Sequence, residues 1–195
     1  QTALLVHPSA AYVGLKAKAA FVAQGTPFDL GVIGVGIDGK PLHGAKIDLR
    51  AVRLDWEFKD GRYRTKERDP QTCEVTSADA EQLCHFATPT GGTYRVLATI
   101  TDERGRPNRT ELTYWVTGGG VDPTRAGVTL IPDRTTYTVG QTAHVLVASP
   151  FYPAEGLVTW RRDGIVKAER VTFDAASKVI DVPITDAVVP NVYVQ

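Results

Sequence analysis

Alternation of apolar and polar residues is the feature that most limits what this chain can fold into. Every second residue is apolar in 94–100 and again in 112–116, and the stretch 102–108 between them contains glycine, proline and asparagine. A period of two places successive side chains on opposite faces of a strand, and a turn-rich stretch between two such runs is typical of a hairpin. The sequence therefore predicts an antiparallel pair of strands here.

The same period predicts strands across much of the chain. Alternating apolar residues mark 143–147 and 180–184 as strands. In 45–56 the apolar positions change parity between Ile47 and Val52, and one extra residue in the strand, a β-bulge, would account for that change. No stretch with helical period is long enough to predict a helix. The chain is therefore predicted to be all-β, built from immunoglobulin-like antiparallel β-sandwiches in tandem.

Three glycines followed by Val-Asp-Pro, at 118–123, predict a flexible connector between two strand-rich halves. The halves also echo each other, because 21–26 and 137–142 each contain an aromatic residue, a glycine turn and the start of a strand. An offset of about 100–115 residues is the size of one sandwich domain. We therefore expect one domain at 1–120, with a disulfide-bridged loop, and a second at 121–195.

The second domain is expected to stop before its last strand. The segment 191–194 parallels 92–96, with Tyr193 in the place of Tyr94, and in the first half a turn and one more strand follow. A sandwich without that strand exposes unpaired backbone groups beside an uncovered apolar face. We expect a strand to complete it, supplied after Gln195 by the parent polypeptide or by a neighbouring copy.

Charge and hydropathy exclude two classes of partner. Lysine plus arginine and aspartate plus glutamate number 22 each, whereas a nucleic-acid-binding protein needs a basic face. No apolar run approaches the roughly 20 residues that span a bilayer, so no transmembrane segment is expected. The chain opens on Gln1 with neither a basic head nor a cleavage site, and the lack of an initiating methionine indicates a processed piece.

The two cysteines, Cys73 and Cys84, flank the polar stretch 74–83. A disulfide that closes so short a loop stabilises the fold by roughly 2–3 kcal/mol on the loop-entropy model. We predict this disulfide, and with it a periplasmic or extracellular location; two unrelated buried thiols are the alternative. No zinc site is expected, because only His85 lies nearby and structural zinc takes four ligands.

No set of residues predicts catalysis. The glycine pattern at 34–39 matches a dinucleotide site, but that site needs a helix after the glycines, so a hairpin turn at 38–41 is preferred. In 81–84 the glutamine precedes the cysteine, which is the wrong order for an internal thioester. Serines and histidines stand singly, outside any nucleophile motif. We therefore expect no catalytic residue, metal site, thioester or cofactor.

Two stretches could contact other molecules: the basic segment 62–68, which contains one aromatic residue, and 160–164, a strand that leads into a turn. Charged residues on an edge strand block unwanted pairing. Solvated edges are therefore one interpretation of these stretches, and contacts with neighbouring domains are the other.

Several segments resemble macroglobulin domains. The segment 130–143 resembles the opening of such a domain, with an acidic/basic pair, a tyrosine, a valine and a glycine before a strand. The segments 149–159 and 162–165 look like the strands that follow in bacterial alpha-2-macroglobulins. In the first half the same family fits the segments 25–28, 38–42, 45–56, 91–94 and 115–119. The resemblance covers nearly the whole chain.

This resemblance implies a piece of a large bacterial protease-trapping inhibitor, secreted or periplasmic. Such proteins string sandwich domains into a cage, present a protease-sensitive bait segment, and often carry a thioester in a separate domain. The implied partners are the remaining domains of the parent and its target proteases. Since neither a thioester motif nor a long unstructured bait stretch is found, a non-catalytic scaffold is expected. The alternative is an extracellular binding or adhesion module, which an exposed row of aromatic residues would favour.

Overall fold

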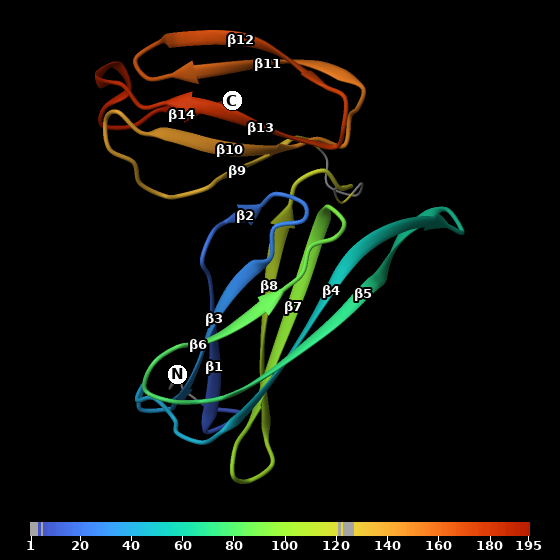
Figure 1. Ribbon diagram of the computed structural model, residues 1–195, viewed down its shortest axis with the longest axis vertical. Coiled ribbons are helices and arrows are strands. Elements are labelled where there is room, and N and C mark those ends of the chain that lie inside the picture. Colours follow the sequence, from blue (N-terminus) through green and yellow to red (C-terminus); the bar gives the residue numbers. More distant parts are fainter. Residues whose placement is uncertain (1–3, 5, 121, 123–126) are drawn as a thin grey trace.

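The structure of the protein is a computed structural model that describes residues 4, 6–120, 122 and 127–195 (Figure 1). Its strands are β1 (Ala11–Ala17), β2 (Phe21–Val22), β3 (Phe28–Gly36), β4 (Lys46–Lys59), β5 (Arg62–Thr76), β6 (Gln82–Phe86), β7 (Gly92–Thr101), β8 (Pro107–Val116), β9 (Thr129–Pro132), β10 (Thr142–Ala148), β11 (Ala154–Arg161), β12 (Ile165–Phe173), β13 (Ser177–Pro183) and β14 (Tyr193–Val194). One turn of 3-10 helix, η1 (Asp186–Val188), is the only helix among the described residues. None of the described segments forms a helix of the length and apolar character needed to cross a bilayer. The predicted all-β class is confirmed.

Strands β1–β8 form the first sandwich, in which a sheet of order β1-β3-β6 packs on a sheet of order β2-β8-β7-β4-β5. The predicted hairpin is confirmed, since β7 and β8 pair antiparallel with Tyr94 opposite Tyr114. The pairing of β4 with β5 shifts register between Ala51 and Arg53, where residues 68–71 of β5 oppose 51–53 of β4. The extra residue thus lies in β5 and not in 45–56 as predicted, since β4 keeps an unbroken register with β7. Strand β2 pairs with β8 in parallel.

Four aromatic rings fill one end of the first core. Phe28 stacks on Tyr114 with ring centroids 4.4 Å apart, and its centroid lies 5.2 Å from that of Phe86 and 6.0 Å from that of Tyr94. All four side chains are almost completely buried. They come from β3, β6, β7 and β8, so this cluster joins both sheets.

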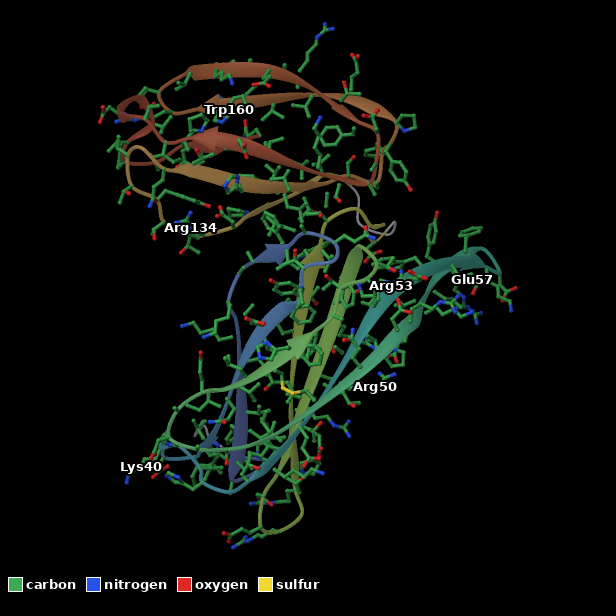
Figure 2. All side chains as sticks on the ribbon, in the orientation of Figure 1. Lys40, Arg50, Arg53, Glu57, Arg134 and Trp160 are labelled. Atoms are coloured by element: carbon green, nitrogen blue, oxygen red, sulfur yellow. A yellow bond between two sulfur atoms is a disulfide. The ribbon has the colours of Figure 1, made fainter. Side chains whose placement is uncertain are left out.

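Strands β9–β14 form the second sandwich, with sheets of order β13-β10-β9 and β12-β11-β14. The predicted strands at 143–147 and 180–184 are confirmed as β10 and β13, although β13 ends at Pro183. The inward faces of both sheets form a second core: Ala143, Val145, Val147, Val158, Trp160, Val171, Phe173, Ile180 and Val182. Figure 2 shows Trp160 between the two layers.

The two sandwiches share one layout. The order β1-β3-β6 corresponds to β9-β10-β13, and β7-β4-β5 corresponds to β14-β11-β12. The turn before the second strand is also repeated: Gly25 and Gly140 both have positive φ, and their N–H groups donate to the carbonyls of Thr88 and Ile184, respectively. Within the described residues, β2 and β8 have no counterpart in the second sandwich.

The predicted match of Tyr193 to Tyr94 is wrong. Tyr94 is fully buried, whereas the side chain of Tyr193 is 60% exposed. Val192 and Val194 instead pack against the second core. Because side chains alternate between faces, a shift of one residue exchanges the inward and outward sets. The inward position that Tyr94 fills in β7 is therefore taken in β14 by a valine.

Burial makes the hydroxyl of Tyr114 a source of alkaline instability. Removal from water, and the nearby charge of Asp29, raise the pKa of Tyr114 from 10.0 to about 12. A raised folded-state pKa means that the stabilising contribution is complete below pH 10 and is lost as the pH rises towards 12, because the unfolded chain ionises first. The loss amounts to about 2–3 kcal/mol.

We therefore expect the free energy of unfolding of the first sandwich to fall between pH 10 and 12, and Tyr114→Phe to remove much of this slope. Urea titrations across this range measure it. Tyr63→Phe is the matched control, because that ring is 45% exposed. If the free energy of unfolding fell equally with pH in the wild type and in Tyr114→Phe, the Tyr114 hydroxyl would not be its cause.

Candidate functional site

The histidines form only simple surface pairs. Ring nitrogens of His43, His85 and His144 lie 3.1, 2.6 and 2.7 Å from carboxylate oxygens of Asp79, Asp29 and Asp181, respectively. These side chains are largely exposed. In the part of the chain that the structure describes, no three His, Cys, Asp or Glu residues come together as a metal site. Each of these three histidines is therefore a surface residue paired with one carboxylate.

The glycine pattern at 34–39 forms a turn. The N–H of Gly36 donates to the carbonyl of Lys40 at 2.9 Å, and Val35 forms a bridge with Pro41. Gly39 has a φ of 78°, which suits glycine. The predicted hairpin turn is confirmed. Along the described chain these glycines are followed by β4 and not by a helix.

A disulfide joins the two layers of the first sandwich. Cys73 lies on β5, at the edge of one sheet, and Cys84 lies on β6, at the edge of the other. Their Cα atoms are 6.0 Å apart, and Cys84 is fully buried in the core. The bond therefore fastens the two sheets together at the open side of the sandwich, in addition to closing the loop between β5 and β6.

We predict that this disulfide forms in the purified protein and that Cys73→Ala/Cys84→Ala lowers the free energy of unfolding by roughly 2–3 kcal/mol. Mass spectrometry of non-reduced peptides should find 73 and 84 linked. Reducing agent should shift the unfolding midpoint of the wild type and leave the double variant unchanged. Free thiols in protein that has never met a reductant would refute the prediction.

The glycines after β8 make a close backbone crossing. A Cβ atom on Gly119 would lie 1.9 Å from the carbonyl carbon of Gly91, and one on Gly91 would lie 2.1 Å from the carbonyl oxygen of Thr117. The N–H of Gly118 donates to Ser177 Oγ at 3.0 Å, which links the first sandwich to β13. These glycines thus allow two backbone segments to approach closely, which the prediction of a flexible connector missed. Positions 121 and 123 of that connector lie outside the described residues.

Gly119→Ala should destabilise the first sandwich by roughly 1–3 kcal/mol, because the added methyl group cannot fit without separating two backbone segments. Gly120→Ala is the matched control, since a Cβ there meets nothing within 4 Å. Denaturant midpoints of the two variants measure the difference. A midpoint for Gly119→Ala equal to that of Gly120→Ala would show that the crossing is loose.

The hairpin of β4 and β5 projects from the body as a two-stranded arm, residues 55–68 (Figure 1). Strand β4 pairs with β7 only as far as Leu54, so beyond that point neither edge of the arm pairs with another described strand. Phe58 and Tyr63 pack edge to face near its tip, with ring centroids 5.0 Å apart and side chains 63% and 45% exposed. The predicted basic strand 62–68 forms one edge of this arm.

Ion pairs hold the base of the arm. Arg53, which is labelled in Figure 2, donates to Asp69 at 2.9 Å and also pairs with Asp55. Glu67 accepts hydrogen bonds from Arg50, at 2.6 Å, and from Arg95, which together hold the pKa of Glu67 below its usual value. Much of the positive charge near the base is therefore neutralised within the chain.

The second sandwich opens into a groove of about 850 Å³, lined mainly by apolar residues. One wall is the loop 134–139, and the other consists of 188–192 and Val194. Its floor contains Ala143 and Val182 from the inner face of the sheet.

Polar contacts fix the loop that forms the first wall. Tyr137 donates its hydroxyl proton to Asp133 at 2.7 Å, and the same carboxylate accepts from the N–H of His144 at 3.0 Å. Although burial acts to raise it, these bonds hold the pKa of Asp133 below its usual value. The N–H of Gln141 donates to Thr138, which closes the turn. The wall is therefore ordered without any strand pairing.

Comparison with known proteins finds similarity to alpha-2-macroglobulins. Residues 128–194, which form the second sandwich, match the family model named "Alpha-2-macroglobulin bait region domain". A curated protein of Nostoc sp., "Alpha-2-macroglobulin homolog", is 26% identical over 203 residues, which cover 96% of this chain and 10% of that protein. The chain thus spans about a tenth of the length of the relative that it matches.

Solved structures of the same family are also similar. The native conformation of Escherichia coli alpha-2-macroglobulin has a TM-score of 0.42 and 15% identity, over 97% of this chain and 14% of that one. A Salmonella alpha-2-macroglobulin mutant has a TM-score of 0.39 and 15% identity, over 96% of this chain and 13% of that one. The Nostoc relative and the bait-region match confirm the predicted resemblance to bacterial alpha-2-macroglobulins.

Proposed function

We propose that this chain, which resembles a segment of a bacterial alpha-2-macroglobulin, is a non-catalytic scaffold of a protease-trapping inhibitor. The similarity to the Nostoc alpha-2-macroglobulin homolog across both sandwiches is the observation that carries the proposal. Each sandwich presents surfaces suited to contact with neighbouring domains, namely the exposed arm 55–68 and the apolar groove. Catalysis forms no part of this role.

The proposed organisation is two macroglobulin-type domains, at 1–120 and 121–195. Two separate hydrophobic cores support it, one drawn from β1, β3, β4 and β6–β8 and the other from β10–β13. The proposed partners are the remaining domains of the parent, including a strand after Gln195, and the proteases that the parent traps. A periplasmic or extracellular location fits the disulfide between the sheets.

The experiment compares the isolated chain with its parent protein. Neither turnover of peptide substrates nor inhibition of a protease such as trypsin is expected from the chain alone. The parent should slow trypsin on a large protein substrate far more than on a small peptide, because a cage excludes only the large one. Stoichiometric inhibition by the chain alone would refute the scaffold role, and a parent that leaves trypsin unaffected would refute the inhibitor.

An extracellular binding module is the second candidate, and the arm is the observation that favours it. Phe58 and Tyr63 are exposed together, with Trp56 half-buried beside them on β4. Exposed aromatic side chains on a projecting ribbon suit recognition of a partner surface. If this role is the main one, Phe58→Ala/Tyr63→Ala should abolish partner binding and leave the unfolding midpoint unchanged.

A further inference from the structure

The second sandwich lacks the neighbour that β7 has in the first. Strand β7 pairs with β4 on one side and with β8 on the other. Its counterpart β14 pairs with β11 only, with Val194 opposite Trp160. The pairing continues through the final residue, since Gln195 exchanges two backbone hydrogen bonds with Thr159. One edge of β14 thus remains open within the described structure.

The other wall of the groove, the loop 134–139, corresponds to β2, which is a neighbour of β8 in the first sandwich. In the first sandwich β2 pairs with β8 in parallel, and the carbonyl of Val22 accepts from the N–H of Thr117 at 3.0 Å. The repeated turn at Gly25 and Gly140 sets the correspondence between the two halves, and it places Tyr137 where Val22 stands. The groove therefore lies between the counterparts of the two strands that flank β8.

The floor of the groove consists of smaller side chains than the matching positions of the first sandwich. Phe28 faces Phe86 in the first sandwich, whereas the corresponding pair in the second is Ala143 facing Val182. In the first sandwich Tyr114 from β8 stacks on Phe28 and completes the core. With smaller residues on the floor, the groove of about 850 Å³ has room for bulky side chains from a strand above it.

We propose that this groove binds one β-strand, antiparallel to β14 and parallel to the loop segment 137–139, and that the strand comes from the polypeptide continuing past Gln195. The strand has apolar residues at alternate positions, with a large aromatic or aliphatic side chain over Ala143. This proposal deepens the function proposed above and rests on it, because it takes the chain to be part of a longer protein.

Chain direction favours the continuing polypeptide over a second copy. Strand β14 runs along β11 towards its N-terminal half, whose edge at Ala154–Val158 has no further partner in the described structure. In the first sandwich the equivalent strand reaches Thr101, turns through 102–106 and returns as β8. The same path from Gln195 would extend β14 and bring the next strand back across the groove.

The test extends the chain after Gln195 by the sequence of residues 96–117, which supplies the rest of a β7-like strand, its turn and a β8-like strand. Hydrogen exchange is then measured at residues 137–139 and 192–194. We expect exchange at both walls to slow at least ~10-fold relative to the unextended chain. A matched extension with aspartate in place of the copied Tyr114 and Val116 should leave the rates unchanged, because charges cannot enter the apolar groove.

Ala143→Trp in the extended chain fills the floor and should remove the protection, whereas Val179→Trp on the outer face of the same sheet should keep it. Equal exchange in the apolar and aspartate extensions would overturn the proposal. Concentration-dependent protection with dimer formation in the unextended chain would also overturn it, in favour of a second copy. None of these measurements uses a protease, so a result against strand binding in the groove can be distinguished from a result against the inhibitor role.

Discussion

The core of the first sandwich depends on the contact between Phe28 and Tyr114. This contact joins a central strand of one sheet to the strand beside β7 in the other, and Phe86 and Tyr94 pack against it to close the end of the first sandwich. A β-sandwich is stable only when both inward faces are covered. The first sandwich has this contact and is closed. The second has no described counterpart of β8, and Ala143 stands in the place of Phe28, so the groove remains there.

The fold class could be predicted from the sequence because inward and outward residues alternate. The hairpin of β7 and β8 followed directly from that period. The bulge predicted in 45–56 lies instead in the partner strand β5, which the pattern within β4 does not reveal. The disulfide geometry agrees with the spacing of Cys73 and Cys84, but the spacing did not show that the bond joins two sheets. That fact depends on which strands lie at the sheet edges, and local pattern does not encode it.

Three features of the candidate surfaces were beyond sequence reasoning. Comparison of the two halves by residue type aligned Tyr193 with Tyr94, but pairing with β11 directs the side chain of Val194 towards the core instead. In a two-residue strand, the partner decides which face is buried. The arm 55–68 was seen only as a basic segment, because the point where β4 leaves β7 depends on a long-range pairing. The groove was anticipated as an uncovered apolar face, although its fixed wall at Asp133–Tyr137 was not.

The glycine crossing determines where the chain leaves the first sandwich. Because Gly119 is packed against Gly91, the backbone that follows the end of β8 lies against the start of β7. Strand β7 lies inside its sheet, hydrogen-bonded to β4 on one side and to β8 on the other. The chain therefore exits beside an inner strand and not at a sheet edge, and any side chain at position 91 or 119 would push the exit out of this path.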